Sequence, residues 1–227
     1  MSPEHTGGNR AYIFLNGDFE KPVRDWPERP ADGDLVLAAD GGGRHVHALD
    51  WPLNCLVGDL DSLEPALVAE FTARGVEISR HPVEKDEIDF ELAMKVARRK
   101  GYSDIEVLGA LGGRWDMTFG NLFLPRASGW GSSRIRFRHG PWDFLVISGP
   151  AEFIEHGRVG DLISLLPLGE DVRGVSLDGC YYPLHKEILR AGFSRGLSNQ
   201  MTEPSLRLKF DSGALLIAHR AELPPVD

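Results

Sequence analysis

Strands and helices alternate along residues 11–139, and this alternation limits the possible folds more than any other feature of the sequence. Short apolar runs such as 11–17 and 35–43 end in glycine and are typical of buried strands. Helical patterns lie between such runs, and residues 86–101 give the clearest one, with Gly101 as its stop. A chain of this kind is expected to form an α/β fold, in which a mostly parallel, doubly wound sheet carries helices on both faces.

The helical period disappears after about residue 140. Short strand candidates follow one another closely from there, and residues 210–216 (FDSGALL) are typical of a hairpin that turns at Gly213. Closely spaced strands without helices favour an all-β domain of the sandwich type. We therefore predict an α/β domain over residues 1–139, followed by a C-terminal β sandwich over residues 140–227.

The charge balance limits the partners that this chain can bind. Its 227 residues include 34 acidic and 25 basic side chains, which give a net charge of −9. Such a surface disfavours binding to a phosphate backbone, so we expect no nucleic-acid partner. An anionic substrate would need local cations, either a metal ion or a few placed Lys and Arg side chains.

Cysteine usage and hydropathy predict the compartment. Cys55 and Cys180 are too few and too far apart for a disulfide framework, which indicates a reducing environment. The stretch 1–10 contains no apolar signal-peptide core, and no apolar run reaches the ~18 residues of a membrane span. We expect a soluble, cytoplasmic protein with no membrane partner.

Charged side chains follow the predicted strands of the first half, at the points where those strands end. In chain order they are Asp40, Asp59, Asp61, Lys85, Asp86, Asp89, Arg114 and Asp116. Each aspartate by itself has an ordinary explanation as a turn residue or a helix N-cap. The carboxyl ends of parallel strands share one edge of a sheet, however, so we expect these side chains to gather there.

The gathered carboxylates favour a divalent cation site that handles phosphates. Asp59 and Asp61, one residue apart, must repel each other unless a cation lies between them. Mg²⁺ takes oxygen ligands and commonly bridges protein carboxylates to substrate phosphates. Glycines near these acids let backbone N–H groups approach phosphate oxygens, while Lys85 and Arg114 can neutralise developing charge. Because the sequence contains neither a Walker A pattern nor G-x-G-x-x-G, any nucleotide chemistry must use another scaffold.

Five ordered motifs resemble those of thiamine pyrophosphokinases. They are ADGG (39–42), GDLDS (58–62), KDEIDFELAM (85–94), GALGGRWDMTFGN (109–121) and LSNQ (197–200). The resemblance implies Mg²⁺-dependent transfer of a diphosphoryl group from ATP to the hydroxyl of thiamine, giving thiamine diphosphate and AMP. It also implies a homodimer with active sites shared between subunits, ATP and metal binding in the first domain, and thiamine binding and dimerisation in the second.

The resemblance also assigns roles to individual residues. The implied catalytic residues are Asp59, Asp61, Lys85, Asp86, Asp89 and Arg114, of which Asp59, Asp61 and Asp89 are the implied metal ligands. The implied nucleotide-binding residues are Asp40, Gly41, Gly42, Gly113, Arg114, Asp116 and Asn121. For Asn121 two roles stay open, a ligand contact or a brace for its loop. Ser198 and Asn199 match the segment that holds thiamine.

Three positions depart from the family pattern. Ile88 replaces a threonine, Met117 a histidine and Gln200 an acid. These changes keep two alternatives open, a diphosphokinase that acts on another alcohol such as a hydroxymethylpterin, or a non-catalytic nucleotide- or thiamine-binding homologue. Ile88 also fits the apolar stripe of its helix, which is a purely structural explanation.

The segment 134–140 (RIRFRHG) alternates arginines with apolar residues. A strand with one basic face is typical of a sheet edge that solvated charges protect from pairing. A basic surface that guides ATP is the less favoured alternative. We predict the solvated edge.

Overall fold

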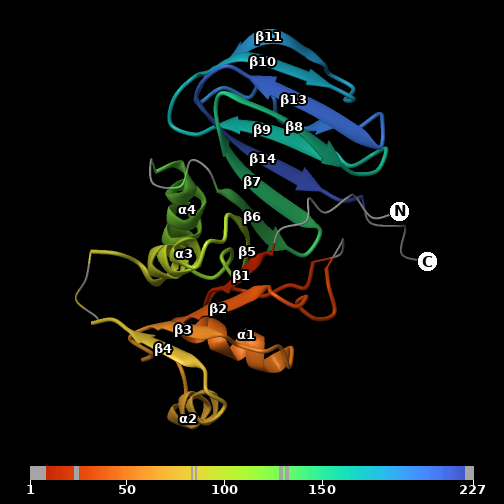
Figure 1. The fold of residues 1–227 in the computed structure, drawn as a ribbon. Coiled ribbons are helices and arrows are strands. Elements are labelled where there is room, and N and C mark those ends of the chain that lie inside the picture. The colour runs from red at the N-terminus through yellow and green to blue at the C-terminus, as the bar shows by residue number, and fades with distance from the viewer. Residues whose placement is uncertain are drawn as a thin grey trace.

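The structure, a computed structural model, describes residues 9–22, 26–82, 84, 86–127, 130 and 133–222 (Figure 1). The elements of the first half are β1 (Ala11–Phe14), β2 (Leu35–Ala39), η1 (Asp40–Gly42), α1 (Gly43–Ala48), β3 (Cys55–Gly58), α2 (Pro65–Ala73), β4 (Glu77–Arg80), α3 (Asp89–Arg99), β5 (Asp104–Leu108), α4 (Trp115–Phe123), η2 (Leu124–Arg126) and β6 (Arg134–His139). The remaining elements are β7 (Trp142–Ser148), β8 (Ala151–His156), β9 (Leu162–Pro167), β10 (Val172–Asp178), β11 (Leu184–Leu189), β12 (Asn199–Gln200), β13 (Ser205–Phe210) and β14 (Ala214–Arg220).

These strands form two sheets. The longer one has ten strands in the order β12-β9-β14-β7-β6-β5-β1-β2-β3-β4, and the shorter has four in the order β11-β10-β13-β8. Pairing is parallel from β4 to β6 and antiparallel from β6 to β12. The predicted fold class, a parallel α/β part followed by an antiparallel sandwich, is therefore confirmed. The sequence did not predict that strands of the C-terminal half would extend the parallel sheet.

Helices cover both faces of the parallel part. Ile13 and Phe14 are consecutive residues of β1, so their side chains point to opposite faces. Ile13 packs in one cluster with Phe90 of α3. Phe14 packs in another cluster with Val46, on α1, and Phe71, on α2. No helix within the described ranges is long and apolar enough to cross a membrane.

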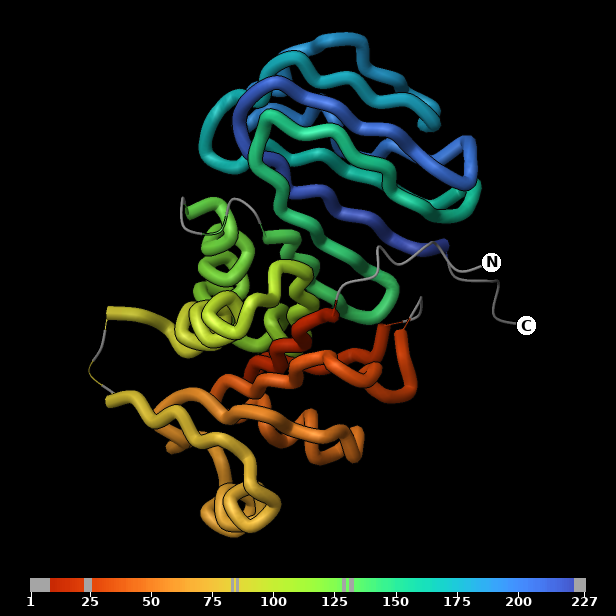
Figure 2. Tube along the Cα trace, viewed as in Figure 1, coloured from red at the N-terminus to blue at the C-terminus, as the bar shows by residue number. Residues whose placement is uncertain are grey.

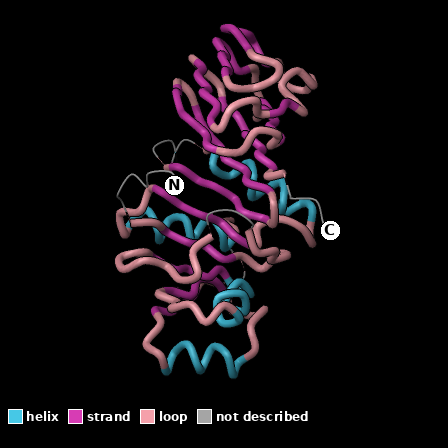
Figure 3. The backbone as a smooth tube through the Cα atoms, turned by 90° about the vertical axis from the view of Figure 1, so that its right-hand side faces the viewer, coloured by secondary structure: helices cyan, strands magenta, loops and turns pink. Residues whose placement is uncertain are grey.

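The C-terminal strands form the sandwich. The four-stranded sheet packs on β7, β9 and β14 through an apolar cluster that includes Leu145, Leu177 and Phe210. β14, near the end of the chain, lies beside β7 (Figure 2). In the view of Figure 3 the top of the molecule consists of strands and loops, whereas helices lie among the strands further down.

Charged side chains separate two apolar clusters on one face of the long sheet. Glu106 lies two residues from Leu108, which packs beside α1 and α2, and Asp143 lies two residues from Leu145 of the sandwich. Arg138 stands between the two acids, with its Nε 2.9 Å from Asp143 and its Nη1 3.9 Å from Glu106. An ionic layer therefore connects the α/β part to the sandwich.

A bidentate pair extends this layer to the shorter sheet. Both Nη atoms of Arg136 donate to Glu155 of β8, at 2.9 and 2.8 Å. Glu155 also lies 3.2 Å from Nδ1 of His219, whose Nε2 is 2.9 Å from Asp161. Glu106, Arg136, Arg138, Asp143 and Glu155, here called the ion belt, are all buried.

The predicted solvated edge at residues 134–140 is therefore wrong. Arg134–His139 form β6, which lies between β5 and β7. Arg136 and Arg138 are only 8% and 6% exposed. Arginines on an interior strand are tolerated because acids from three other strands pair with them.

The predicted hairpin around Gly213 is also wrong. The chain does turn there, with a φ of 98° that favours glycine. The flanking strands lie in different sheets, however, since β13 pairs with β8 and β10 while β14 pairs with β7 and β9. The turn at Gly213 can be predicted from the local sequence. The strands with which β13 and β14 pair are distant in the chain and cannot be predicted from it.

We predict that Glu155→Gln lowers the free energy of unfolding by about 3 kcal/mol at pH 7, because it leaves the buried Arg136 short of its main counter-charge. Burial raises the pKa of Glu155, but Arg136 and His219 lower it more, so the net pKa lies below the ordinary value of 4.5. The contribution of the carboxylate is thus complete above pH 4.5 and declines as the pH falls. Urea unfolding should show the difference between variant and wild type shrinking toward pH 3.

Glu152→Gln provides the matched control on the same strand. Glu152 is half-exposed and lies 3.6 Å from Lys209 and 4.0 Å from Arg207. Such pairs contribute less than about 1 kcal/mol. Equal destabilisation by the two substitutions would contradict a special role for the ion belt.

Candidate active site

Loops at the carboxyl ends of the parallel strands pack against one another. The loop after β1 meets the loop after β5 through three hydrogen bonds. Gly17 N donates to Gly109 O at 2.7 Å, Asp18 N donates to Leu111 O at 3.1 Å, and Gly113 N donates to the Asp18 carboxylate at 3.1 Å. Loops that are far apart in the chain thus lie together at the carboxyl ends of the parallel strands, and this edge of the sheet is here called the rim.

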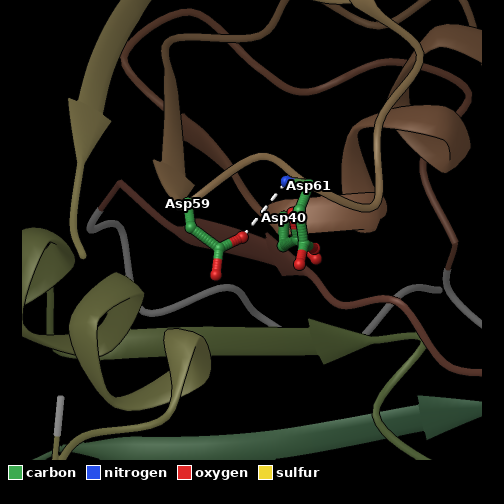
Figure 4. A group of neighbouring side chains, drawn as sticks. All are labelled: Asp40, Asp59 and Asp61. Atoms are coloured by element: carbon green, nitrogen blue, oxygen red, sulfur yellow. Dashed lines mark hydrogen bonds between the residues drawn. The ribbon is translucent and has the colours of Figure 1, made fainter. Parts of the chain in front are cut away.

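Three predicted aspartates meet at this rim. Asp40, Asp59 and Asp61 each offer a carboxylate oxygen, and these atoms lie within 4.8 Å of one another (Figure 4). Asp40 is buried, Asp59 is half-buried and Asp61 is exposed. The Asp61 N–H donates to Oδ1 of Asp59 at 3.1 Å, which holds the turn between them.

Unusual backbone conformations produce this approach. Asp40 has a φ of 47° and Leu60 one of 68°, values that non-glycine residues rarely adopt. Gly58 has a φ of 135°, and a Cβ placed on it would lie 3.3 Å from both Asp40 Cβ and Asp89 Oδ1. Asp89, the first residue of α3, therefore lies beside Gly58 and near Asp40, although it is not one of the three acids whose carboxylate oxygens meet within 4.8 Å. A side chain at position 58 would be strained and would crowd the site.

The donor set fits a hard divalent cation. Oδ1 of Asp40 is buried and has no hydrogen-bond partner among the described residues. A buried carboxylate oxygen without a donor is costly, and two further acids stand close to it. Carboxylate oxygens are the ligands that Mg²⁺ prefers. Asp40, Asp59 and Asp61 thus have the chemistry to hold such an ion, with Asp89 near Asp40.

Gly41 and Gly42 are needed for packing. Both are buried in η1. A Cβ on Gly41 would lie 2.1 Å from Oδ1 of Asn16, and one on Gly42 would lie 2.0 Å from the Phe14 carbonyl oxygen. Glycine at these positions lets the Asp40 loop sit directly against the end of β1.

Arg114 and Asp116 pair with each other at the start of α4. Nε of Arg114 donates to Asp116 at 3.2 Å and Nη2 donates at 2.5 Å. This pairing lowers the pKa of Asp116. Both side chains are exposed, next to Gly113. Asn121 is buried and donates to the Ala110 carbonyl at 2.9 Å, which is the bracing contact of the two alternatives.

The predicted thiamine residues lie far from the acids within one chain. Ser198 and Asn199 are at β12, one end of the long sheet, and eight strand steps separate β12 from β3. At about 4.8 Å per step, this is roughly 38 Å along the sheet. The buried Asn199 accepts from Tyr182 N and donates to Tyr182 O, so its amide holds the Tyr181–Tyr182 loop. Ser198 is exposed, with a φ of 55°.

The other predicted residues of this region have different surroundings. Lys85 lies outside the described residues. Asp86 is exposed in the turn before α3. Ile88 packs against the core beside α3, which is the structural explanation of this departure from the family pattern.

Sequence reasoning missed three residues of the rim, namely Asn16, Asp18 and Arg44. Asn16 and Asp18 follow β1, just as the predicted acids follow β2 and β3. The same rule about strand ends could therefore have identified them. Arg44 lies on α1 and does not directly follow a strand, so the rule about strand ends does not identify it.

Two family models match consecutive parts of the chain. The model described as "Thiamin pyrophosphokinase, catalytic domain" matches residues 30–128, which include the three acids. The model described as "Thiamin pyrophosphokinase, vitamin B1 binding domain" matches residues 152–215. The two matches fall on the α/β part and on the sandwich.

Individual relatives agree with this assignment. Thiamine pyrophosphokinase of Bacillus subtilis (strain 168) is 27% identical over 161 residues, which cover 70% of this chain and 75% of that protein. The crystal structure of thiamine pyrophosphokinase from Bacillus subtilis has a TM-score of 0.83 at 22% identity and covers 95% of this chain and 100% of that one. Yeast thiamin pyrophosphokinase has a TM-score of 0.71 at 15% identity, over 95% of this chain and 87% of that one. These structures share the fold. Because both family models match this chain, one after the other, the chain belongs to the thiamine pyrophosphokinase family of enzymes.

Proposed function

We propose that this protein transfers the diphosphoryl group of ATP to the hydroxyl of thiamine, producing thiamine diphosphate and AMP, with Mg²⁺ as cofactor. One observation carries the proposal. The carboxylates of Asp40, Asp59 and Asp61 converge within 4.8 Å inside the segment that the catalytic-domain model matches. A match to a vitamin B1 binding domain over residues 152–215 supports thiamine as the acceptor.

The acids are proposed to bind the metal and phosphates. Asp59, Asp61 and Asp89 would hold Mg²⁺, with Asp40 completing the negative site. Bound Mg²⁺ would neutralise phosphate charge and make the β-phosphorus a better electrophile. In its absence the clustered carboxylates would repel the triphosphate, so ATP binding should depend on the cation.

The nucleotide is proposed to lie along the loops at the carboxyl ends of the strands. Lys85 and Arg114 would offset the charge of the phosphates and of the leaving AMP. Arg114 must then exchange its partner Asp116 for phosphate, which its exposure permits. The remaining nucleotide-loop residues are Asp40, Gly41, Gly42, Gly113, Asp116 and Asn121.

The reaction itself forms one bond and breaks one. The thiamine hydroxyl oxygen attacks the β-phosphorus in line with the bond to the α-phosphate oxygen, which leaves with AMP. The hydroxyl proton passes to a carboxylate, for which Asp86 and Asp89 are the candidates. In Asp89 this role competes with metal binding.

We propose a homodimer in which residues 1–139 of one subunit bind ATP and metal while residues 140–227 of the other bind thiamine. The separation of Ser198 and Asn199 from the acids within one chain supports a shared site. Both parts of the chain carry large exposed apolar side chains. Trp115 and Phe119 lie on α4 of the α/β part, and Tyr181 and Phe193 lie on the sandwich. Large exposed apolar groups of this kind are typical of interfaces.

The direct test is incubation with ATP, Mg²⁺ and thiamine, with chromatographic measurement of AMP and thiamine diphosphate. Equal amounts of the two products are expected, and a chelator should abolish both. A parallel reaction with hydroxymethylpterin serves as the acceptor control. No turnover with thiamine would overturn the proposal.

Asp40→Asn should abolish activity yet stabilise the metal-free protein. Unit charges no more than 4.8 Å apart repel by at least about 1 kcal/mol in water and about 3 kcal/mol at an effective dielectric constant of 20. Asparagine tolerates a φ of 47°, so the backbone should persist. We expect the Tm of the metal-free variant to rise by about 2 °C or more, and we expect Mg²⁺ to raise the Tm of the variant less than it raises that of the wild type.

Asp50→Asn is the matched control for this prediction. Asp50 has a φ of 51° but is exposed and pairs only at the surface, with Arg29 at 3.3 Å. This substitution should leave both Tm and activity nearly unchanged. A lower Tm for metal-free Asp40→Asn would show that the cluster is not under electrostatic strain.

Mixing two inactive variants tests the shared site. Asp59→Asn disables the metal half and Ser198→Lys disables the thiamine half. In a heterodimer with shared sites, one site takes both intact halves, so mixing should restore up to about a quarter of wild-type activity after subunit exchange. Sites contained within single chains would give no recovery at any mixing ratio.

A further inference from the structure

Arg44 connects two loops of the rim. It is an exposed residue of α1, and its Nη1 donates to the Ser62 carbonyl at 2.5 Å while Nη2 donates to Oδ1 of Asn16 at 2.5 Å. Asn16 follows β1, and Ser62 directly follows Asp61. A single guanidinium therefore spans the loop after β1 and the turn after β3.

The contact continues into the carboxylates. Ser62 Oγ donates to Oδ1 of Asp61 at 3.1 Å, and the Asp61 N–H donates to Oδ1 of Asp59 at 3.1 Å. Asn16 in turn touches the Asp40 loop, since a Cβ on Gly41 would lie 2.1 Å from its Oδ1. The guanidinium thus lies between the segment that carries Asp40 and the turn that carries the other two acids.

Charge alone does not explain an arginine here. Both acceptors are neutral oxygens, so the described hydrogen bonds of Arg44 include no carboxylate. A positive charge beside a cation site weakens cation binding, although water screens an exposed group. The planar fork of the guanidinium can reach two acceptors on different loops at once, and a lysine ammonium cannot reproduce that geometry.

We propose that Arg44 is a positioning residue that sets the spacing of the metal carboxylates, by fixing the Asp59–Ser62 turn against the loop after β1. The inference rests on the proposed metal site. It predicts that the geometry of the Arg44 fork, and not its charge, controls cation affinity.

Substitutions at two positions test this, with Mn²⁺ affinity measured by calorimetry in the absence of substrates. Loss of a residue that orients metal ligands typically weakens metal binding by about tenfold or more, and we expect about a tenfold loss for both Arg44→Lys and Arg44→Gln. Asn16→Ala should weaken Mn²⁺ binding as well. The double variant Asn16→Ala with Arg44→Lys should be no worse than Arg44→Lys alone, because both changes break the same bridge.

Arg74→Lys and Arg74→Gln are the matched controls. Arg74 follows α2 and pairs with Glu70 on the surface at 3.4 Å, so neither change should alter Mn²⁺ affinity. Thermal unfolding of all variants should differ little from wild type. In turnover assays we expect the Arg44 variants to raise KM for the Mg²⁺–ATP complex more than they lower kcat.

The outcomes separate the explanations. Wild-type affinity in Arg44→Lys, or tighter binding in Arg44→Gln, would make charge the relevant property and overturn the positioning role. Wild-type protein that binds Mn²⁺ without forming thiamine diphosphate would overturn the proposed function and leave this inference intact. Wild-type protein that does not bind Mn²⁺ would overturn both.

Discussion

The ion belt is the interaction on which the arrangement of this molecule depends. Arg136 and Glu155 are buried charges that are each other's main partner, and removing either one is expected to cost about 3–5 kcal/mol. Their carriers, β6 and β8, belong to different sheets. The apolar cluster beside α1 and α2 and the cluster inside the sandwich meet at these charges. Directional pairs permit far fewer alternative packings than apolar contacts do. We therefore infer that the ion belt helps to orient the four-stranded sheet on the long sheet.

A continuous sheet has a consequence for function. Because β7, β14, β9 and β12 extend the parallel strands, the C-terminal half grows away from the rim where Asp59 and Asp61 lie. Ser198 is then at the opposite end of the sheet. The same strand pairing that gives the chain a single long sheet thus separates the two halves of the proposed site. The proposed homodimer would bring the two halves together from different subunits.

The proposed metal site lies where the backbone adopts unfavourable conformations. Asp40 and Leu60 have positive φ values, and Gly58 leaves room that any side chain would fill. Such conformations cost free energy and persist only because the surrounding strands hold them. Like-charged groups add to this cost. A cation that binds here would relieve the repulsion, which couples metal binding to the stability of the loops.

The sequence by itself determined many of the helices and strands and the convergence of Asp40, Asp59 and Asp61. Local periodicity predicts the helix at α3 and the strands that end near Asp40 and Asp59. These acids gather because the carboxyl ends of parallel strands share one edge of the sheet. Tertiary structure alone decided the burial of Arg136 and Arg138, the separation of β13 from β14, and the bridge from Arg44 to Asn16. Those features depend on pairing between distant segments, such as Arg44 and Asn16 across 28 residues or Gly113 and Asp18 across 95. A local sequence pattern predicts which face of a helix or strand a side chain lies on. The partner that it contacts there comes from a distant segment, so only the folded structure identifies it.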